Sequence, residues 1–291
     1  MSRSAILIHN PGSGQRRDRF HSVTRMVDAL RLRGITAIPQ VTTGPADATR
    51  LTAAAIEARA DLVIVHGGDG TVNEAIQVLI GTSIPLAVWP GGTSNVLARE
   101  LGLPGGLDLL ADVIARAVTR RVSVGRAGER YFLLMAGVGL DADVVRAVNP
   151  GLKRLTGEGA YWMAGLRQLT DWHPVQFLLE TEAGQHSATF AVVANAPSYG
   201  GGLRFAPEAR MDDDLLDVCL FDSTQRHRFA RYLAAAFSGS HLGMPGVTYL
   251  KTRRAVVHGD GSRFVQVDGE LLGPLPVSFE CVTDALSLVV P

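Results

Sequence analysis

The sequence predicts an α/β protein in which residues 1–122 form a parallel sheet with helices on both faces, followed by a largely antiparallel β-rich domain over 123–291. Three observations carry this prediction. Strand-like and helical runs alternate up to about residue 124, as in a parallel sheet covered on both faces. Three strand-like runs of this half end in glycine turns. Beyond about residue 121, short β-rich runs dominate, which favours antiparallel pairing.

Hydrophobic spacing predicts the elements of the first domain in order. Phe20, Val23, Val27 and Leu30 recur at helical spacing, and an alanine-rich segment after Pro45 also predicts a helix. Strands are expected at 5–9, 35–41, 61–66 and 85–89, and helices from about residue 20 and at 46–60, 71–80, 94–101 and 107–119.

The second domain is predicted mainly from short runs rich in β-branched and aromatic residues. Strands are expected at 131–136, 175–181, 189–194, 215–221, 255–258, 264–268, 277–282 and 286–290, and helices at 159–171 and 224–237. No low-complexity linker marks the boundary between the two domains, and no repeats are evident.

Composition excludes several classes of function. Lys+Arg and Asp+Glu both number 28, so no general basic field exists to attract nucleic acid, and no nucleic-acid partner is expected. Lys153 and Lys251 are the only lysines and neither follows a glycine-rich loop, which disfavours Walker-type proteins and protein kinases. The start lacks the features of a signal peptide and no apolar run could span a bilayer, so we expect a cytoplasmic protein. Cys219 and Cys281 lie in apolar runs and are expected to be buried, reduced thiols.

The most informative motif is Gly67-Gly68-Asp69-Gly70-Thr71, which directly follows an apolar strand-like run. Its glycines leave backbone N–H groups uncovered, and the helix that follows points its positive end at the same place, so the turn suits phosphate. Asp69 can anchor Mg²⁺ that bridges phosphate oxygens. The alternative is a tight strand-to-helix turn in which Asp69 only caps the helix.

Two further strand-like runs end in similar turns, at 10–14 (Asn-Pro-Gly-Ser-Gly) and at 91–95 (Gly-Gly-Thr-Ser-Asn). Loops that follow the carboxyl ends of neighbouring parallel strands share one crevice. The three turns are therefore expected to meet and bind the phosphates of a nucleotide.

With these motifs in this order, and with Tyr199-Gly200-Gly201-Gly202, the run 207–217 and Val267-Asp268-Gly269-Glu270, the chain resembles the diacylglycerol kinase catalytic family along essentially its whole length. That family includes bacterial lipid kinases, sphingosine kinases and ceramide kinases. NAD kinases and 6-phosphofructokinases are similar at the Gly-Gly-Asp-Gly-Thr element, so the resemblance implies a first domain of their type. Asn73-Glu74 and the first loop favour the lipid branch.

The resemblance implies a site, position by position. The residues that fall where the family binds ATP are Asn10, Pro11, Gly12, Ser13, Gly14, Thr42, Gly68, Asp69, Gly70, Thr71, Val72, Asn73, Glu74 and Thr93. Glu270 falls where the family has its proton acceptor. Arg210, Asp213 and Leu215 match a family metal position, usually regarded as structural, in which Asp213 gives a side-chain contact and the other two give carbonyls.

Each of these assignments has a simpler alternative. Asp268-Gly269-Glu270 is also an ordinary hairpin signal, and the acidic run around Asp213 fits a solvated turn.

Two departures from the family pattern matter: Val96 follows Asn95 where many members have Asp, and Asp214 stands where glycine is common. His9 and His66 could border the nucleotide or be structural.

A lipid kinase must meet a membrane, and two segments offer aromatic and basic side chains for this contact. The first comprises Lys153, Arg154, Tyr161, Trp162, Leu166, Arg167, Leu169 and Trp172. The second comprises Arg226, Arg228, Phe229, Arg231, Tyr232, Leu233 and Phe237. Ordinary amphipathic helices that dock on the β domain have the same pattern.

The sequence therefore predicts a cytoplasmic lipid kinase with transient peripheral membrane contact, which uses ATP and Mg²⁺ to phosphorylate a hydroxyl of a diacylglycerol-like or sphingoid lipid. Two alternatives stay open: NAD kinase-like transfer to a soluble nucleotide, and a nucleotide-binding regulatory protein without turnover. The lipid headgroup is not identified, and the oligomeric state, including a homodimer, is open.

Overall fold

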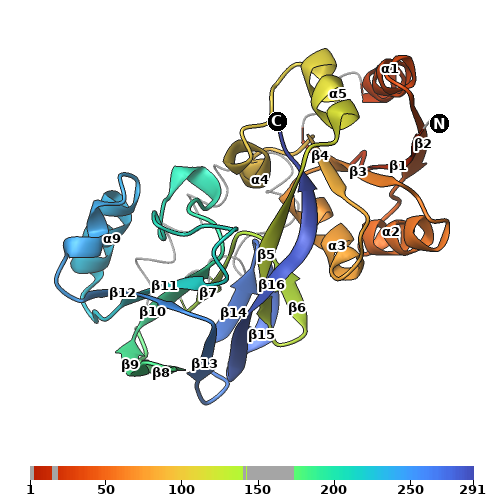
Figure 1. Ribbon diagram of the computed structural model, residues 1–291. Coiled ribbons are helices and arrows are strands. Elements are labelled where there is room, and N and C mark those ends of the chain that lie inside the picture. Colours follow the sequence, from red (N-terminus) through yellow and green to blue (C-terminus); the bar gives the residue numbers. More distant parts are fainter. Residues whose placement is uncertain (1–2, 15–18, 140–141, 143–173) are drawn as a thin grey trace. The chain divides into compact units, whose positions relative to one another are not determined.

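The computed structural model describes residues 3–14, 19–139, 142 and 174–291, and these divide into two compact units (Figure 1). The first unit contains residues 1–122 and Asp284–Pro291, and the second contains Ser123–Thr283. The last residues thus belong to the first unit and not to the second domain, to which the sequence assigned them. The reason is that the final strand leaves one unit and enters the other.

The first unit is a parallel sheet with helices on both faces (Figure 1). Its strands are β1 (Arg3–His9), β2 (Ile35–Val41), β3 (Leu62–Gly67) and β4 (Leu86–Pro90). Its helices are α1 (Arg19–Leu32), α2 (Asp47–Glu57), α3 (Asp69–Leu79), α4 (Val96–Glu100) and α5 (Leu107–Arg116). The spatial order is β2-β1-β3-β4, and the carboxyl end of β16 (Val277–Val289) pairs in parallel with β4.

Two layers of helices bury the sheet of the first unit. On one face, Met26 and Leu30 of α1 pack with Leu110 and Ile114 of α5 over the inward side chains of the strands. Helices α2 and α3 contact each other on the opposite face. β3 is buried along its whole length, as expected for a central strand covered on both sides.

The strand order places a topological switch point between β1 and β3. From β1 the chain moves to β2 on one side, and from β2 it returns to β3 on the other side of β1. In sheets of this kind, ligands bind outside the carboxyl ends of the strands at the switch point. The loops that follow β1 and β3 are those that carry Asn10 and Gly68.

The second unit is built from antiparallel strands. They are β5 (Thr119–Ala127), β6 (Arg130–Phe132), β7 (Met135–Val138), β8 (Phe177–Thr181), β9 (Gly184–Ala188), β10 (Phe190–Ala194), β11 (Leu216–Phe221), β12 (Val247–Thr252), β13 (Arg254–His258), β14 (Phe264–Val267) and β15 (Glu270–Pro274). Six of them form a sheet in the order β12-β11-β10-β7-β14-β15. β9, β8, β13 and the start of β16 pair in a second group, and β5 pairs with β16 and β6.

Two apolar clusters hold the second unit together. One contains side chains of both strand groups, among them Val193, Val218, Val257 and Phe279, and forms a sandwich core. The other lies on the opposite face of the six-stranded sheet, under α9 (Arg226–Ala236) and the short 3₁₀ turns Gly200–Gly202 and Ser240–Gly243. Cys219 and Cys281 are buried and free, as expected.

Several expected elements differ from the structure. Residues 131–136 are not one strand, because β6 ends at Phe132 and β7 begins at Met135. The two strands expected at 277–282 and 286–290 are one strand, β16, which ends at Val289. α3 begins at Asp69, two residues before the expected start at Thr71. The helix expected at 159–171 lies outside the described residues.

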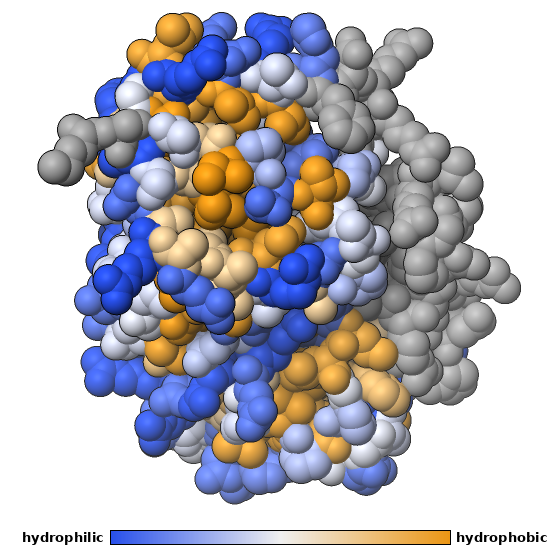
Figure 2. Space-filling view, turned by 90° about the vertical axis from the view of Figure 1, so that its right-hand side faces the viewer, coloured by the Kyte–Doolittle hydropathy of each residue, from blue (hydrophilic) through white to orange (hydrophobic). Residues whose placement is uncertain are grey.

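Several large apolar side chains of the described residues are more than one-third exposed, among them Leu32, Ile38, Leu109 and Val118 of the first unit. Figure 2 shows one face, where apolar side chains lie among polar ones. None of the helices within the described ranges has the length and apolar character that a bilayer crossing demands.

Candidate active site

The first loop, after β1, is fixed to the start of α3. Asn10 Nδ2 donates to Thr71 Oγ1 over 2.8 Å, and the Asn10 backbone N–H donates to the His66 carbonyl over 2.9 Å. Asn10 Oδ1 accepts from Gly12 N at 2.8 Å, which folds the loop back on itself. One side chain therefore shapes the first loop and ties it to the second.

The second and third loops touch through their backbones. Gly91 N donates to the Gly67 carbonyl over 2.8 Å. A Cβ at Gly92 would lie 2.5 Å from the Gly68 Cα, and a Cβ at Gly67 would lie 2.6 Å from Thr71 Cβ. Only glycine allows this approach, so the spatial meeting of the three turns that the sequence predicts is present within the first unit.

Asp69 joins the second loop to the third. Its Oδ2 accepts from Val96 N and its Oδ1 from Leu97 N, both at 3.1 Å. These amides belong to the first turn of α4, where Asn95 adopts a left-handed backbone with φ 44°. Asp69 therefore caps a helix, as the simpler alternative held, but the helix is α4 and not the one that Asp69 begins.

Asn95 also closes the third loop on itself. Its Oδ1 accepts from Gly92 N at 2.8 Å and its Nδ2 donates to the Gly92 carbonyl at 2.9 Å. Val96, which replaces the Asp of many family members, is buried. A polar side chain at position 96 is thus not needed to hold this loop, because Asn95 and Asp69 supply its hydrogen bonds.

The predicted residues after β2 and in α3 also form a connected group. Thr42 N donates to the His9 carbonyl at 2.9 Å, so Thr42 lies beside the end of β1. Glu74 Oε2 accepts from Ala48 N at 3.1 Å in the first turn of α2. Asp47 accepts from Thr43 N at 2.7 Å and from its hydroxyl at 2.5 Å. Glu74 and Asp47 therefore fix α2 to this edge of the sheet.

The remaining predicted nucleotide residues differ in exposure. Thr93 is exposed at the third loop, and Pro11 and Gly12 are exposed at the first, with Ser13 and Gly14 half-buried. Gly70 is half-buried in the first turn of α3, where the first helical amides have no partner within the helix. Val72 and Asn73 are buried, so their side chains support the loops from behind.

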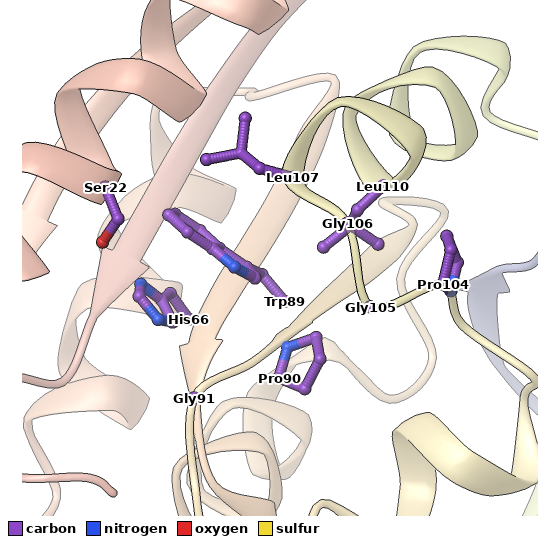
Figure 3. A pocket seen from close by; sticks show the side chains of 10 residues that line it. All are labelled: Ser22, His66, Trp89, Pro90, Gly91, Pro104, Gly105, Gly106, Leu107 and Leu110. Carbon is purple, nitrogen blue, oxygen red and sulfur yellow. The ribbon is translucent and has the colours of Figure 1, made fainter. Parts of the chain in front are cut away.

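Three aromatic rings lie directly behind the loops. His66 stacks on Trp89 with ring centroids 3.6 Å apart, and its centroid is 4.8 Å from that of His9. Figure 3 shows His66 and Trp89 in the wall of a cavity of about 310 Å³ that Leu107 and Leu110 of α5 also line. Both histidines are buried, which favours the structural interpretation of them.

In the second unit, Glu270 follows a two-residue hairpin turn between β14 and β15. Val267 pairs with Glu270, and Asp268 and Gly269 have positive φ angles of 47° and 84°. This is the type I′ geometry that an Asp-Gly pair favours. The hairpin that the sequence signals is therefore present, and Glu270 is the first residue of its returning strand.

Two contacts fix this hairpin and its carboxylate. Asp268 accepts from the amides of Leu133 at 2.8 Å and Leu134 at 3.0 Å, which follow β6, and of Met135 at 3.1 Å, which begins β7. Arg130 Nη2 lies 2.6 Å from Glu270 Oε2. Sequence reasoning missed Arg130, because no motif surrounds it and its partner is 140 residues away.

The side chains of the predicted metal residues make ion pairs or lie partly exposed. Arg210 pairs with Asp212 at 2.9 Å, and Asp213 pairs with Lys251 at 2.9 Å. Leu215 precedes β11 and is half-buried. Asp214 has φ 35°, so it does adopt the left-handed backbone for which glycine is common. In the part of the chain that the structure describes, no three His, Cys, Asp or Glu side chains are grouped to hold a metal ion.

Of the two segments with membrane-contact patterns, the first lies outside the described residues. In the second, Phe229 and Tyr232 of α9 are buried against the six-stranded sheet, whereas Phe237 and the three arginines are exposed. The Tyr232 hydroxyl donates to the Pro245 carbonyl at 2.7 Å. α9 therefore docks its apolar face on the β domain, which is the simpler of the two alternatives.

The chain matches two family models. Residues 4–127 match the diacylglycerol kinase catalytic domain, and residues 135–290 match the YegS C-terminal NAD kinase beta sandwich-like domain. Among curated proteins, a diacylglycerol kinase of Mycobacterium tuberculosis (strain ATCC 25618 / H37Rv) is 34% identical, covering 90% of this chain and 87% of that protein. A diacylglycerol kinase of Bacillus subtilis (strain 168) is 29% identical, covering 99% and 96%.

Solved structures agree on the fold. A crystal structure of a diacylglycerol kinase from Bacillus anthracis str. Sterne aligns with a TM-score of 0.79 at 24% identity, covering 99% of this chain and 97% of the other. The architecture of both units therefore has a known counterpart.

Proposed function

The chain belongs to the diacylglycerol kinase family, and on that premise we propose that it transfers the γ-phosphate of ATP to a hydroxyl group of a diacylglycerol-like or sphingoid lipid. A family of lipid kinases supports phosphoryl transfer to a lipid alcohol. The lipid itself and the use of ATP are the proposed parts.

The observation that carries this proposal is the junction of three glycine loops at the switch point of the first sheet. Asn10, Gly68 and Gly92 bring the loops into contact, and helix α3 begins in the same place. Backbone N–H groups and the positive end of a helix stabilise phosphate oxygens, and no lysine takes part in these loops. We infer that the triphosphate of ATP binds along 10–14, 68–74 and Thr93, with Thr42 at the side.

We assign Mg²⁺ to Asp69. Mg²⁺ in kinase sites is bound through one or two carboxylates together with substrate phosphates, so a single carboxylate at this junction is sufficient. Each carboxylate oxygen of Asp69 accepts one amide and keeps a further lone pair. When bound, the ion neutralises charge on the phosphate oxygens.

We assign the proton acceptor to Glu270. In the reaction, the lipid hydroxyl oxygen forms a bond to the γ-phosphorus, its proton passes to Glu270, and the bond from the γ-phosphorus to the bridging oxygen of ADP breaks. Arg130 holds one carboxylate oxygen of Glu270, which leaves the other for the hydroxyl proton. A lipid acceptor also implies transient contact of a cytoplasmic protein with a membrane surface.

The test is incubation of the purified protein with Mg²⁺ and γ-labelled ATP against a total lipid extract, with identification of the labelled product. NAD is supplied in a parallel reaction. Label in a lipid phosphate supports the proposal. Label in a soluble nucleotide would replace it with an NAD kinase-like activity, and ATP binding without any labelled product would leave a regulatory protein.

A further inference from the structure

A lysine side chain contacts Asp213, the one side chain that the family resemblance assigns to a metal ion. Lys251 Nζ is 2.9 Å from Asp213 Oδ2, 3.4 Å from Asp217 Oδ1 and 3.4 Å from the Glu208 carbonyl oxygen. An ammonium group has three N–H donors, and here each has an oxygen acceptor. Two carboxylates and a carbonyl are also the kinds of ligand that hard divalent cations prefer.

The backbone fixes this arrangement. Asp217 on β11 and Lys251 on β12 are direct partners in the antiparallel register. Tyr249, two residues earlier on β12, donates its hydroxyl to Asp217 Oδ1 at 2.6 Å. Because side chains two apart share one face of a sheet, β12 presents both groups to the same carboxylate.

The Asp217 side chain is fully buried. An ionised carboxylate out of contact with water needs a counter-charge or hydrogen bonds. Lys251 supplies the counter-charge at 3.4 Å, and the Tyr249 hydroxyl supplies a hydrogen bond at 2.6 Å.

The choice of lysine is itself informative. Of the 28 Lys and Arg residues only Lys153 and Lys251 are lysines, so this chain uses arginine almost everywhere for positive charge. An ammonium is a compact point charge, whereas a guanidinium is a planar fork. Among side chains, the ammonium is the nearest equivalent of a small cation.

The donor set does not suit a divalent ion while Lys251 is in place. Asp213, the one side-chain ligand of that site, already gives one oxygen to Lys251. Ca²⁺ takes six to eight oxygens and Mg²⁺ six. We propose that the Lys251 ammonium is a built-in replacement for the structural metal of the family, so that the second unit does not depend on a bound divalent ion.

The same geometry predicts what happens without the lysine. Asp213 Oδ1 and Asp217 Oδ2 are buried and make no hydrogen bond. Removal of the ammonium would leave both carboxylates facing a gap beside the Glu208 carbonyl. A divalent cation should then enter and restore the lost stability.

The experiment is thermal unfolding of the nucleotide-free protein in EDTA and in millimolar Mg²⁺ or Ca²⁺, for the wild type, Lys251→Met, and Lys251→Met combined with Asp213→Asn. It needs neither ATP nor lipid, so its result is independent of the proposed kinase activity. We expect the wild-type Tm to be unchanged by either ion, and Lys251→Met to unfold about 4 °C lower or more in EDTA and to regain most of this loss with metal. The double variant should not respond to metal.

Three results would overturn the proposal: a wild-type Tm that rises with metal and loses this rise in Asp213→Asn, a Lys251→Met protein as stable as the wild type in EDTA, or a folded Lys251→Met protein that metal does not stabilise. If Lys251→Met does not fold, the comparison of wild type with Asp213→Asn decides alone, and an unresponsive wild type supports the proposal.

Discussion

Arg130 and Glu270 form an ion pair across two strands of the second unit, with Nη2 and Oε2 2.6 Å apart. Both side chains are partly exposed, so the pair contributes at most about 1 kcal/mol to stability. Its main effect is orientation, because it fixes one oxygen of the carboxylate that we propose as the proton acceptor.

Glu270→Gln should lower turnover by about 10² to 10⁴-fold, because the amide cannot accept the hydroxyl proton. The fold should persist, since the carboxylate is partly exposed and the turn is held by Asp268. The measurement is the initial rate at saturating lipid, alongside the unfolding temperature. Arg130→Gln is the matched variant. It keeps the Glu270 carboxylate but removes its ion pair, so a smaller loss of turnover is expected. Unchanged turnover in Glu270→Gln would remove this residue from the mechanism.

Asp69→Asn should affect both stability and activity. An amide has one oxygen and would direct an N–H group at a backbone donor, so we expect a loss of about 1–3 kcal/mol in unfolding free energy. Turnover should fall by about 10²-fold or more, because charge neutralisation by a metal is worth several kcal/mol. Unfolding and phosphorylation assays on one preparation measure both effects.

The matched control for Asp69 is Asp61→Asn. Asp61 precedes β3 at the opposite edge of the sheet and accepts from Ser4 N at 2.8 Å and from the Ser4 hydroxyl at 2.9 Å. The Asp61→Asn protein should be less stable than the wild type but should keep its turnover at temperatures where the fold is intact. Equal effects of the two substitutions on turnover would show that Asp69 acts only through the fold.

Gly92→Ala should separate the second and third loops. Its Cβ would lie 2.5 Å from the Gly68 Cα, and because the Cβ is bonded rigidly to its own backbone and the Gly68 Cα is itself backbone, one loop has to move. We expect kcat/KM for ATP to fall about 10-fold or more, since small displacements of positioning groups are costly. Gly105→Ala is the control, because no atom lies within 4 Å of its added Cβ. Normal ATP kinetics in folded Gly92→Ala would contradict a nucleotide site at this junction.

Acid should release the loop after β2. Hydrogen bonds from the Thr43 hydroxyl and amide, and then from Arg50, lower the pKa of Asp47 to about 2, from an ordinary value of 3.8. Because the folded-state pKa is the lower one, this carboxylate stabilises the fold above pH 3.8 and the contribution disappears as the pH falls towards 2. Denaturant unfolding should therefore show that the difference in unfolding free energy between wild type and Asp47→Asn shrinks as the pH falls from 3.8 towards 2. A difference that stays constant down to pH 2 would disprove the linkage.

The fold of the first unit was predictable because its signals are local. A buried strand followed by glycines and a helix specifies each β-α unit, and the three strands that end in turns place Asn10, Gly68 and Gly92 at one edge. The partners of these residues were not predictable in the same way. The contacts from Asp69 to Val96 and from Glu74 to Ala48 depend on how the helices pack, which no local pattern encodes.

The second unit was predicted less completely. β9 and β12 are short and rich in polar residues, so their hydrophobic alternation is weak. The sequence predicts two strands for β16 because Asp284 interrupts the apolar pattern, and in the structure Asp284 lies within the strand with φ 50°. The role of Lys251 depends on its register with Asp217 across two strands, and only the structure supplies that register.

β16 also bears on how the first unit is completed during synthesis. Leu288 and Val289 are buried, and Leu288 pairs with Leu86 of β4. The ribosome must therefore translate the entire second unit before the fifth parallel strand of the first can be added. A fragment that stops at residue 122 would leave β4 without its β16 partner, as an unpaired edge strand. Producing the first unit alone therefore requires a rearranged gene that joins residues 284–291 directly to residues 1–122.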